Sequence, residues 1–153
     1  MAGSTALDAG IDASGQIKPP LKYLVYTKNC LDQRLPLLNR HQCVQAAQDN
    51  ESAGKLGHLD SYKDSALFSG RETLALEFAE RMAYTGKRVT DRFFKRLQKE
   101  FTDKELVELS TIIPCENFRS KFNPVFGIEA NGLCHLPAVQ SMEEDAAKTF
   151  HKR

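Results

Sequence analysis

Apolar residues recur at helical spacing through the first half of the chain. After Pro36, which suits the first turn of a helix, apolar positions fall three or four residues apart as far as Asn50. The earlier apolar stretch Leu21–Tyr26, which follows a proline pair and has no hairpin turn after it, predicts a shorter helix. No convincing strand pattern occurs elsewhere, so the sequence predicts an all-α fold.

Two capping boxes mark the helix starts of the second half. In Ser69–Glu72, the serine hydroxyl and the glutamate carboxylate can each accept a hydrogen bond from a free backbone N–H. We expect the helix that follows to bury Leu74, Phe78 and Met82 and to end at Gly86.

Two further helices are expected after that glycine. Thr90 or Asp91 can cap the first, and the second capping box, Thr102–Glu105, begins the last helix. Pro114 should bend that last helix, and Gly127 should close it. The expected core positions of the two helices are Phe93, Phe94 and Leu97, then Leu106, Leu109, Ile113 and Phe122.

Composition agrees with one globular domain. The 153 residues are 41% apolar and 27% charged, with a formal net charge of +1. Such a balance excludes attraction to nucleic acid or membrane by bulk charge.

We expect a flexible N-terminal arm over 1–17, a helical domain over 18–135 and a charged tail over 136–153. With no apolar leader and no apolar run long enough for a membrane helix, the expected location is the cytoplasm.

Several side chains are chemically versatile. His41 lies on an apolar helix face, where it is either a general acid or base or a core histidine. Cys30, Cys43 and Cys115 are either reactive thiols or small buried apolar groups. The histidines and cysteines lack the spacing of metal ligands, so we expect no metal.

A basic stripe follows Gly86 and imitates part of a helix-turn-helix. The next helix begins with carboxylates that would face DNA phosphates, so we expect the stripe to face solvent or another subunit, with no nucleic-acid partner. Its members are Arg88, Arg92, Lys95, Arg96 and Lys99.

Four segments, in this order and spacing, resemble the carboxymuconolactone decarboxylase and alkylhydroperoxidase D-like (AhpD-like) family. They are Phe68–Met82, Val89–Phe94, Phe101–Ile113 and Asn117–Asn123. The match covers about residues 65–127 and, weakly, 20–60. The resemblance implies an AhpD-like helical bundle that assembles as a trimer or hexamer, with a pocket near the subunit boundaries and a small-molecule substrate.

Peroxidase members of this family carry C-x-x-C-x-x-x-H. When the motif histidine is aligned with His41, its two cysteine positions fall on Arg34 and Leu37. The resemblance therefore favours the decarboxylase branch. It implies a cofactor-free lyase for a small carboxylated substrate, in which His41 is the acid or base and Arg34 or Arg40 binds the carboxylate.

Two other hypotheses remain open. Cys30 and Cys43 can meet across the start of the His41 helix and support a peroxidase with non-standard cysteines. Alternatively, the chain is a non-catalytic oligomeric binding protein. The surroundings of His41 and of the two sulfur atoms would distinguish these hypotheses.

Overall fold

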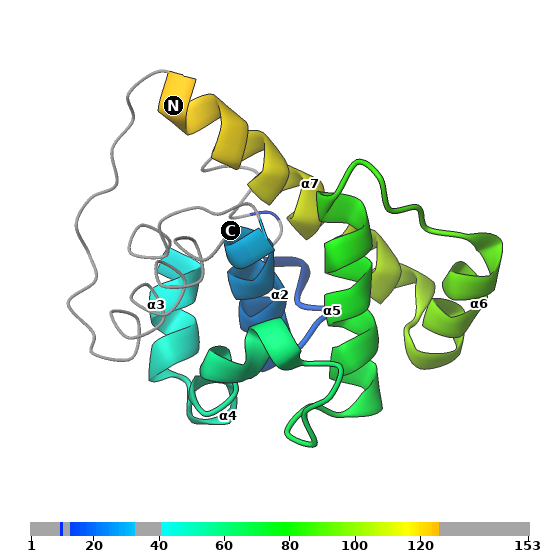
Figure 1. The fold of residues 1–153 in the computed structure, drawn as a ribbon, viewed down its shortest axis with the longest axis horizontal. Coiled ribbons are helices and arrows are strands. Elements are labelled where there is room, and N and C mark those ends of the chain that lie inside the picture. The colour runs from blue at the N-terminus through cyan, green and yellow to red at the C-terminus, as the bar shows by residue number, and fades with distance from the viewer. Residues whose placement is uncertain (1–9, 11–12, 33–40, 126–153) are drawn as a thin grey trace.

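The computed structural model describes residues 10, 13–32 and 41–125, and these residues form helices without any strand (Figure 1). The all-α prediction is confirmed. The helices are α2 (Pro19–Asp32), α3 (His41–Gln48), α4 (Asn50–Ala53), the 3-10 helix η2 (Leu56–Ser61), α5 (Gly70–Ala83), α6 (Asp91–Glu100) and α7 (Asp103–Val125).

Helix α2 occupies the centre of the bundle and contacts α3, α5 and α7 (Figure 1). Its Val25 packs into one apolar core with residues of α5, α6 and α7. Its Leu24 packs into a second core with residues of α3, η2 and α5. Because α2 is covered on several sides, polar residues on it have little access to water.

Both predicted capping boxes are present. Ser69 accepts a hydrogen bond from the Glu72 N–H, while the Glu72 carboxylate accepts one from the Ser69 N–H. Thr102 and Glu105 make the same reciprocal pair at the start of α7. The predicted cap of α6 is Thr90, whose hydroxyl accepts from the Phe93 N–H.

The helix ends differ from the predictions in detail. Helix α5 ends at Ala83, three residues before the predicted Gly86, and the Tyr84 N–H closes it on the Glu80 carbonyl. Pro114 lies inside α7, which continues to Val125. The predicted end of that helix at Gly127 lies outside the described residues.

Two phenylalanines predicted in the core are exposed. Phe94 is 40% exposed, because Phe93 and Leu97 direct one face of α6 to the core and Phe94 lies about 100° around the helix. Phe122 is 41% exposed and stacks on Phe118, where α7 extends beyond α5 (Figure 1).

The region expected to be a flexible arm includes a residue of the core. Ile17 is 1% exposed, and its N–H donates to Glu108 Oε2 at 2.9 Å, as does the N–H of Gln16. Lys22 pairs with the other oxygen of the same carboxylate at 2.5 Å. The start of α2 is thereby fixed to α7.

Candidate functional site at the end of α2

The C-terminal part of α2 buries an unusual concentration of polar side chains. Lys28 is 5% exposed, Asn29 is fully buried and Cys30 is 1% exposed. The side chain of Asp32, the last residue of the helix, is 6% exposed. Buried polar groups destabilise a protein unless they are paired, so this cluster is the strongest candidate for a site with a chemical role.

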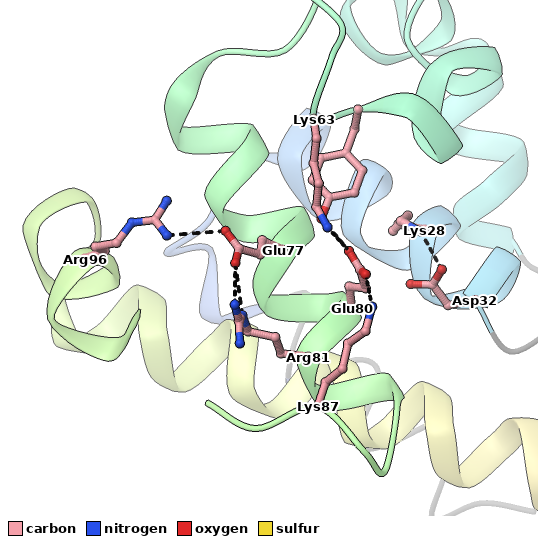
Figure 2. A network of polar contacts seen from close by, with 9 residues as sticks. Lys28, Asp32, Lys63, Glu77, Glu80, Arg81, Lys87 and Arg96 are labelled. Atoms are coloured by element: carbon pink, nitrogen blue, oxygen red, sulfur yellow. Dashed lines mark hydrogen bonds and ion pairs between the residues drawn. The ribbon is translucent and has the colours of Figure 1, made fainter. Parts of the chain in front are cut away.

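Lys28 and Asp32 form an ion pair within one turn of α2 (Figure 2). The Lys28 ammonium also lies 5.6 Å from the centroid of the Tyr62 ring. Burial raises the pKa of Asp32, although Lys28 opposes that shift, and the carboxylates of Glu80 and Asp60 raise it further. The Asp32 carboxyl is therefore easier to protonate than an exposed one.

Asn29 connects the same end of α2 to α7. Its Nδ2 donates to the carbonyl of Ile113 at 3.2 Å. Its Oδ1 and the Asp32 Oδ2 are both buried without a hydrogen-bond partner. The cluster is therefore only partly satisfied.

Glu80 of α5 organises a second polar group beside the cluster (Figure 2). It accepts a 2.6 Å hydrogen bond from the Tyr62 hydroxyl and pairs with Lys63 at 2.9 Å and with Lys87. Burial alone would raise the pKa of Glu80, but Lys87, Tyr62 and Lys63 together lower it to about 2. Glu80 is therefore a permanent negative charge near Asp32.

The basic stripe lies elsewhere, on α6 and the segment before it. Arg96 contacts Glu77 at 3.5 Å, and Arg81 pairs with the same carboxylate at 2.7 Å (Figure 2). The stripe residues of α6 are exposed, as are Arg88 and its neighbours before the helix. The predicted solvent-facing orientation agrees with this exposure.

The structure places only some of the predicted site residues. Cys30 is buried in α2. His41 is the first residue of α3 and Cys43 lies in the first turn, but both side chains are outside the described part of the chain, as are Arg34 and Arg40 altogether. Whether the two sulfur atoms of Cys30 and Cys43 meet stays a prediction.

Sequence reasoning missed three polar residues of the cluster, namely Lys28, Asn29 and Asp32. One signal was present, because Lys28 and Asp32 are four residues apart and can pair on a helix surface. Their burial, however, depends on how α3, η2 and α5 pack around α2.

The described part of the chain contains neither a metal-binding cluster nor a membrane-spanning helix. No group of three or more His, Cys, Asp or Glu side chains there could hold a metal ion. Among the same residues, no helix has the length and apolar character to cross a membrane.

Comparison with known proteins identifies the fold but not the family. No family profile matches the sequence. The chain is 36% identical over 98 residues to the uncharacterized protein YnjA of Escherichia coli (strain K12), a match that covers 64% of this chain. The chain spans about half of that relative, 54% of its length.

Two solved structures share the architecture. The debrominase Bmp8 without ligand superposes with a TM-score of 0.77, at 16% identity, and the match covers 95% of this chain and 75% of Bmp8. A cysteine-to-alanine variant of Bmp8 in complex with 2,3,4-tribromopyrrole gives a TM-score of 0.76 with the same identity and coverage. The all-helical fold of this chain is thus the fold of a known debrominase.

Proposed function

We propose that this chain is a carboxymuconolactone decarboxylase-like, AhpD-like protein and an enzyme for a small organic molecule. Three features support the proposal. The segments that carry the family resemblance form α5, α6 and α7 with both predicted capping boxes. The fold is that of a debrominase, and ionisable side chains are buried where α2 ends.

The proposed active site lies between the end of α2 and the start of α3. The two helices contact each other. Eight residues, which include Arg34 and Arg40, separate Asp32 from His41. The buried polar cluster on α2 is the single observation that carries this location, because an interior built for stability alone favours apolar side chains.

The proposed reaction is a cofactor-free, lyase-type decarboxylation. An arginine, Arg34 or Arg40, holds the carboxylate of a small substrate, and His41 moves the proton that the reaction needs. When carbon dioxide leaves, the electron pair of the broken bond stays on carbon and must be neutralised by a proton. A buried, polar site limits the access of water to that carbanion.

The test is turnover of carboxymuconolactone by the purified full chain, followed by release of carbon dioxide. We expect His41→Ala to lower turnover by roughly 10²–10⁴, the usual contribution of positioned proton transfer, without loss of the fold. His58→Ala is the matched control, since His58 is exposed in η2. A His41→Ala protein that is unstable by about 1–3 kcal/mol but has normal specific activity in its folded fraction would identify a core histidine instead.

Cysteine chemistry is the second candidate, because Cys30 is buried in the polar part of α2. The Bmp8 complex was obtained with a cysteine-to-alanine variant. Without C-x-x-C, the reduced protein should not reduce alkyl hydroperoxides as a dithiol peroxidase does. Dithiol-dependent turnover that disappears in Cys30→Ser or Cys43→Ser, and persists in Cys115→Ser, would establish this candidate.

The chain is further proposed to act as a homo-oligomer, a trimer or hexamer. Phe118, Phe122 and Val125 of α7 are exposed. Apolar side chains on one helix end are suited to contact with another subunit. An oligomer that turns over none of these compounds would favour the non-catalytic binding protein.

A further inference from the structure

Two buried oxygen atoms without hydrogen-bond partners lie one turn apart on α2. They are Oδ1 of Asn29 and Oδ2 of Asp32. Side chains three residues apart on a helix are neighbours. An unsatisfied acceptor in the interior destabilises the folded protein, so two such acceptors together call for a functional explanation.

The unpaired oxygen of Asp32 is held in a defined position. Lys28 binds Oδ1 of the same carboxyl group (Figure 2). The Lys28 ammonium lies over the ring of Tyr62, whose hydroxyl donates to Glu80. Asp32 is thus supported by residues of α2, α5 and the segment after η2, while Oδ2 is buried and accepts no hydrogen bond.

The charges around Asp32 favour proton exchange. Burial raises its pKa, Lys28 on the same helix opposes the shift, and Glu80 of α5 and Asp60 of η2 add to it. Tyr62 stays protonated, because burial and the hydrogen bond to Glu80 raise its pKa. A carboxyl group whose pKa lies closer to neutral is a better acid or base under physiological conditions.

We propose that Asp32 is a second proton-transferring residue of the site at the end of α2, acting through Oδ2, beside the buried Oδ1 of Asn29. This inference rests on the proposed function and assigns a further residue to the same site.

In the proposed step, the bond between carbon and the carboxylate breaks, carbon dioxide leaves, and the electron pair remains on carbon. The O–H bond of protonated Asp32 breaks and its proton forms the new C–H bond. Asp32 becomes a carboxylate paired with Lys28, and it regains a proton from solvent, with His41 as the relay.

The experiment compares the full chain with Asp32→Asn and with Asp91→Asn, an exposed control on α6 with the same change of charge. With carboxymuconolactone, we expect Asp32→Asn to lower kcat by about 10²-fold or more. KM should change little, and the pH dependence that Asp32 gives to kcat should disappear. Asp91→Asn should keep both kcat and its pH profile.

A second readout does not depend on turnover. Carbon-13 NMR of the labelled aspartate carboxyls should show one titration with a pKa above the usual range, and Asp32→Asn should remove it. An Asp32 pKa at or below the ordinary value overturns the inference, even if Asp32→Asn does not fold.

The two proposals fail in different ways. If the unchanged protein is active and Asp32→Asn keeps its kcat and pH profile, Asp32 is not a proton-transferring residue and the proposed function stands. If the unchanged protein is itself inactive, the proposed function is wrong, and the role of Asp32 falls with it.

Discussion

Replacing Glu108 should cost a large part of the free energy of unfolding. Glu108 is 5% exposed, pairs with Lys22 at 2.5 Å, and accepts hydrogen bonds from the N–H groups of Gln16 and Ile17 at 2.9 Å each. Glu108→Leu removes the carboxylate that pairs with a buried ammonium and accepts two backbone hydrogen bonds, a change that costs about 3–5 kcal/mol. In a chain of this length, such a loss lowers Tm by roughly 6–20 °C.

A double-mutant cycle identifies the source of that loss. Adding Lys22→Met to Glu108→Leu removes the buried positive charge as well, so most of the stability should return. A residual loss of about 1–3 kcal/mol should remain for the backbone donors of residues 16 and 17. The assay is urea unfolding followed by circular dichroism, with Glu100→Leu on exposed surface as the control. A loss below about 1 kcal/mol for Glu108→Leu, or no recovery in the double variant, would refute the reasoning.

The Glu108–Lys22 ion pair also predicts that the free energy of unfolding depends on pH. Burial would raise the pKa of Glu108, but Lys22 and the Ile17 N–H lower it below the ordinary value. A lowered folded-state pKa means that the carboxylate stabilises the fold above its unfolded-state pKa, and that this contribution is lost as pH falls through the folded-state pKa. The penalty of Glu108→Leu should therefore shrink when unfolding is measured in acid.

Three further predictions concern a cap, a hydrogen bond and the assembly. Ser69→Ala should lower the free energy of unfolding by about 0.5–2 kcal/mol, measured by urea unfolding, and an unchanged midpoint would contradict the cap. Tyr62→Phe should lower the free energy of unfolding by about 1 kcal/mol at pH 7, because Glu80 loses a hydrogen bond. The pKa of Glu80 should rise from about 2 towards its ordinary value, so the variant should lose less stability than the unchanged protein between neutral pH and acid. Light scattering at micromolar concentration should give a multiple of 17.2 kDa, and a monomeric mass would count against the oligomer.

Local sequence rules predicted the helices because the interactions that start a helix are local. Ser69 and Glu72 are three residues apart, and their reciprocal hydrogen bonds need no distant partner. The exposure of Phe94 and Phe122 could not be predicted in this way. Apolar spacing identifies a helix face, but only the packed neighbours decide how far that face extends and where the core ends.

Polar residues that the fold buries were the hardest to predict. Ile17 and Glu108 are 91 residues apart, and nothing near either one indicates their contact. Lys28 and Asp32 have the spacing of an ordinary surface pair, yet η2 and α5 lie beside them. For His41, Arg34 and Arg40, the family resemblance remains the sole guide to a role.

The two buried ion pairs of α2 differ in the hydrogen bonds that their carboxylates accept. At the start of the helix, Glu108 pairs with Lys22 and accepts two backbone hydrogen bonds, so its burial is compensated. At the end of the helix, Asp32 keeps one oxygen unpaired and Asn29 beside it does the same. A fold selected for stability alone would fill this position with apolar side chains or complete its hydrogen bonds. This incomplete hydrogen bonding at Asp32 and Asn29 is the observation on which the proposed role of Asp32 rests.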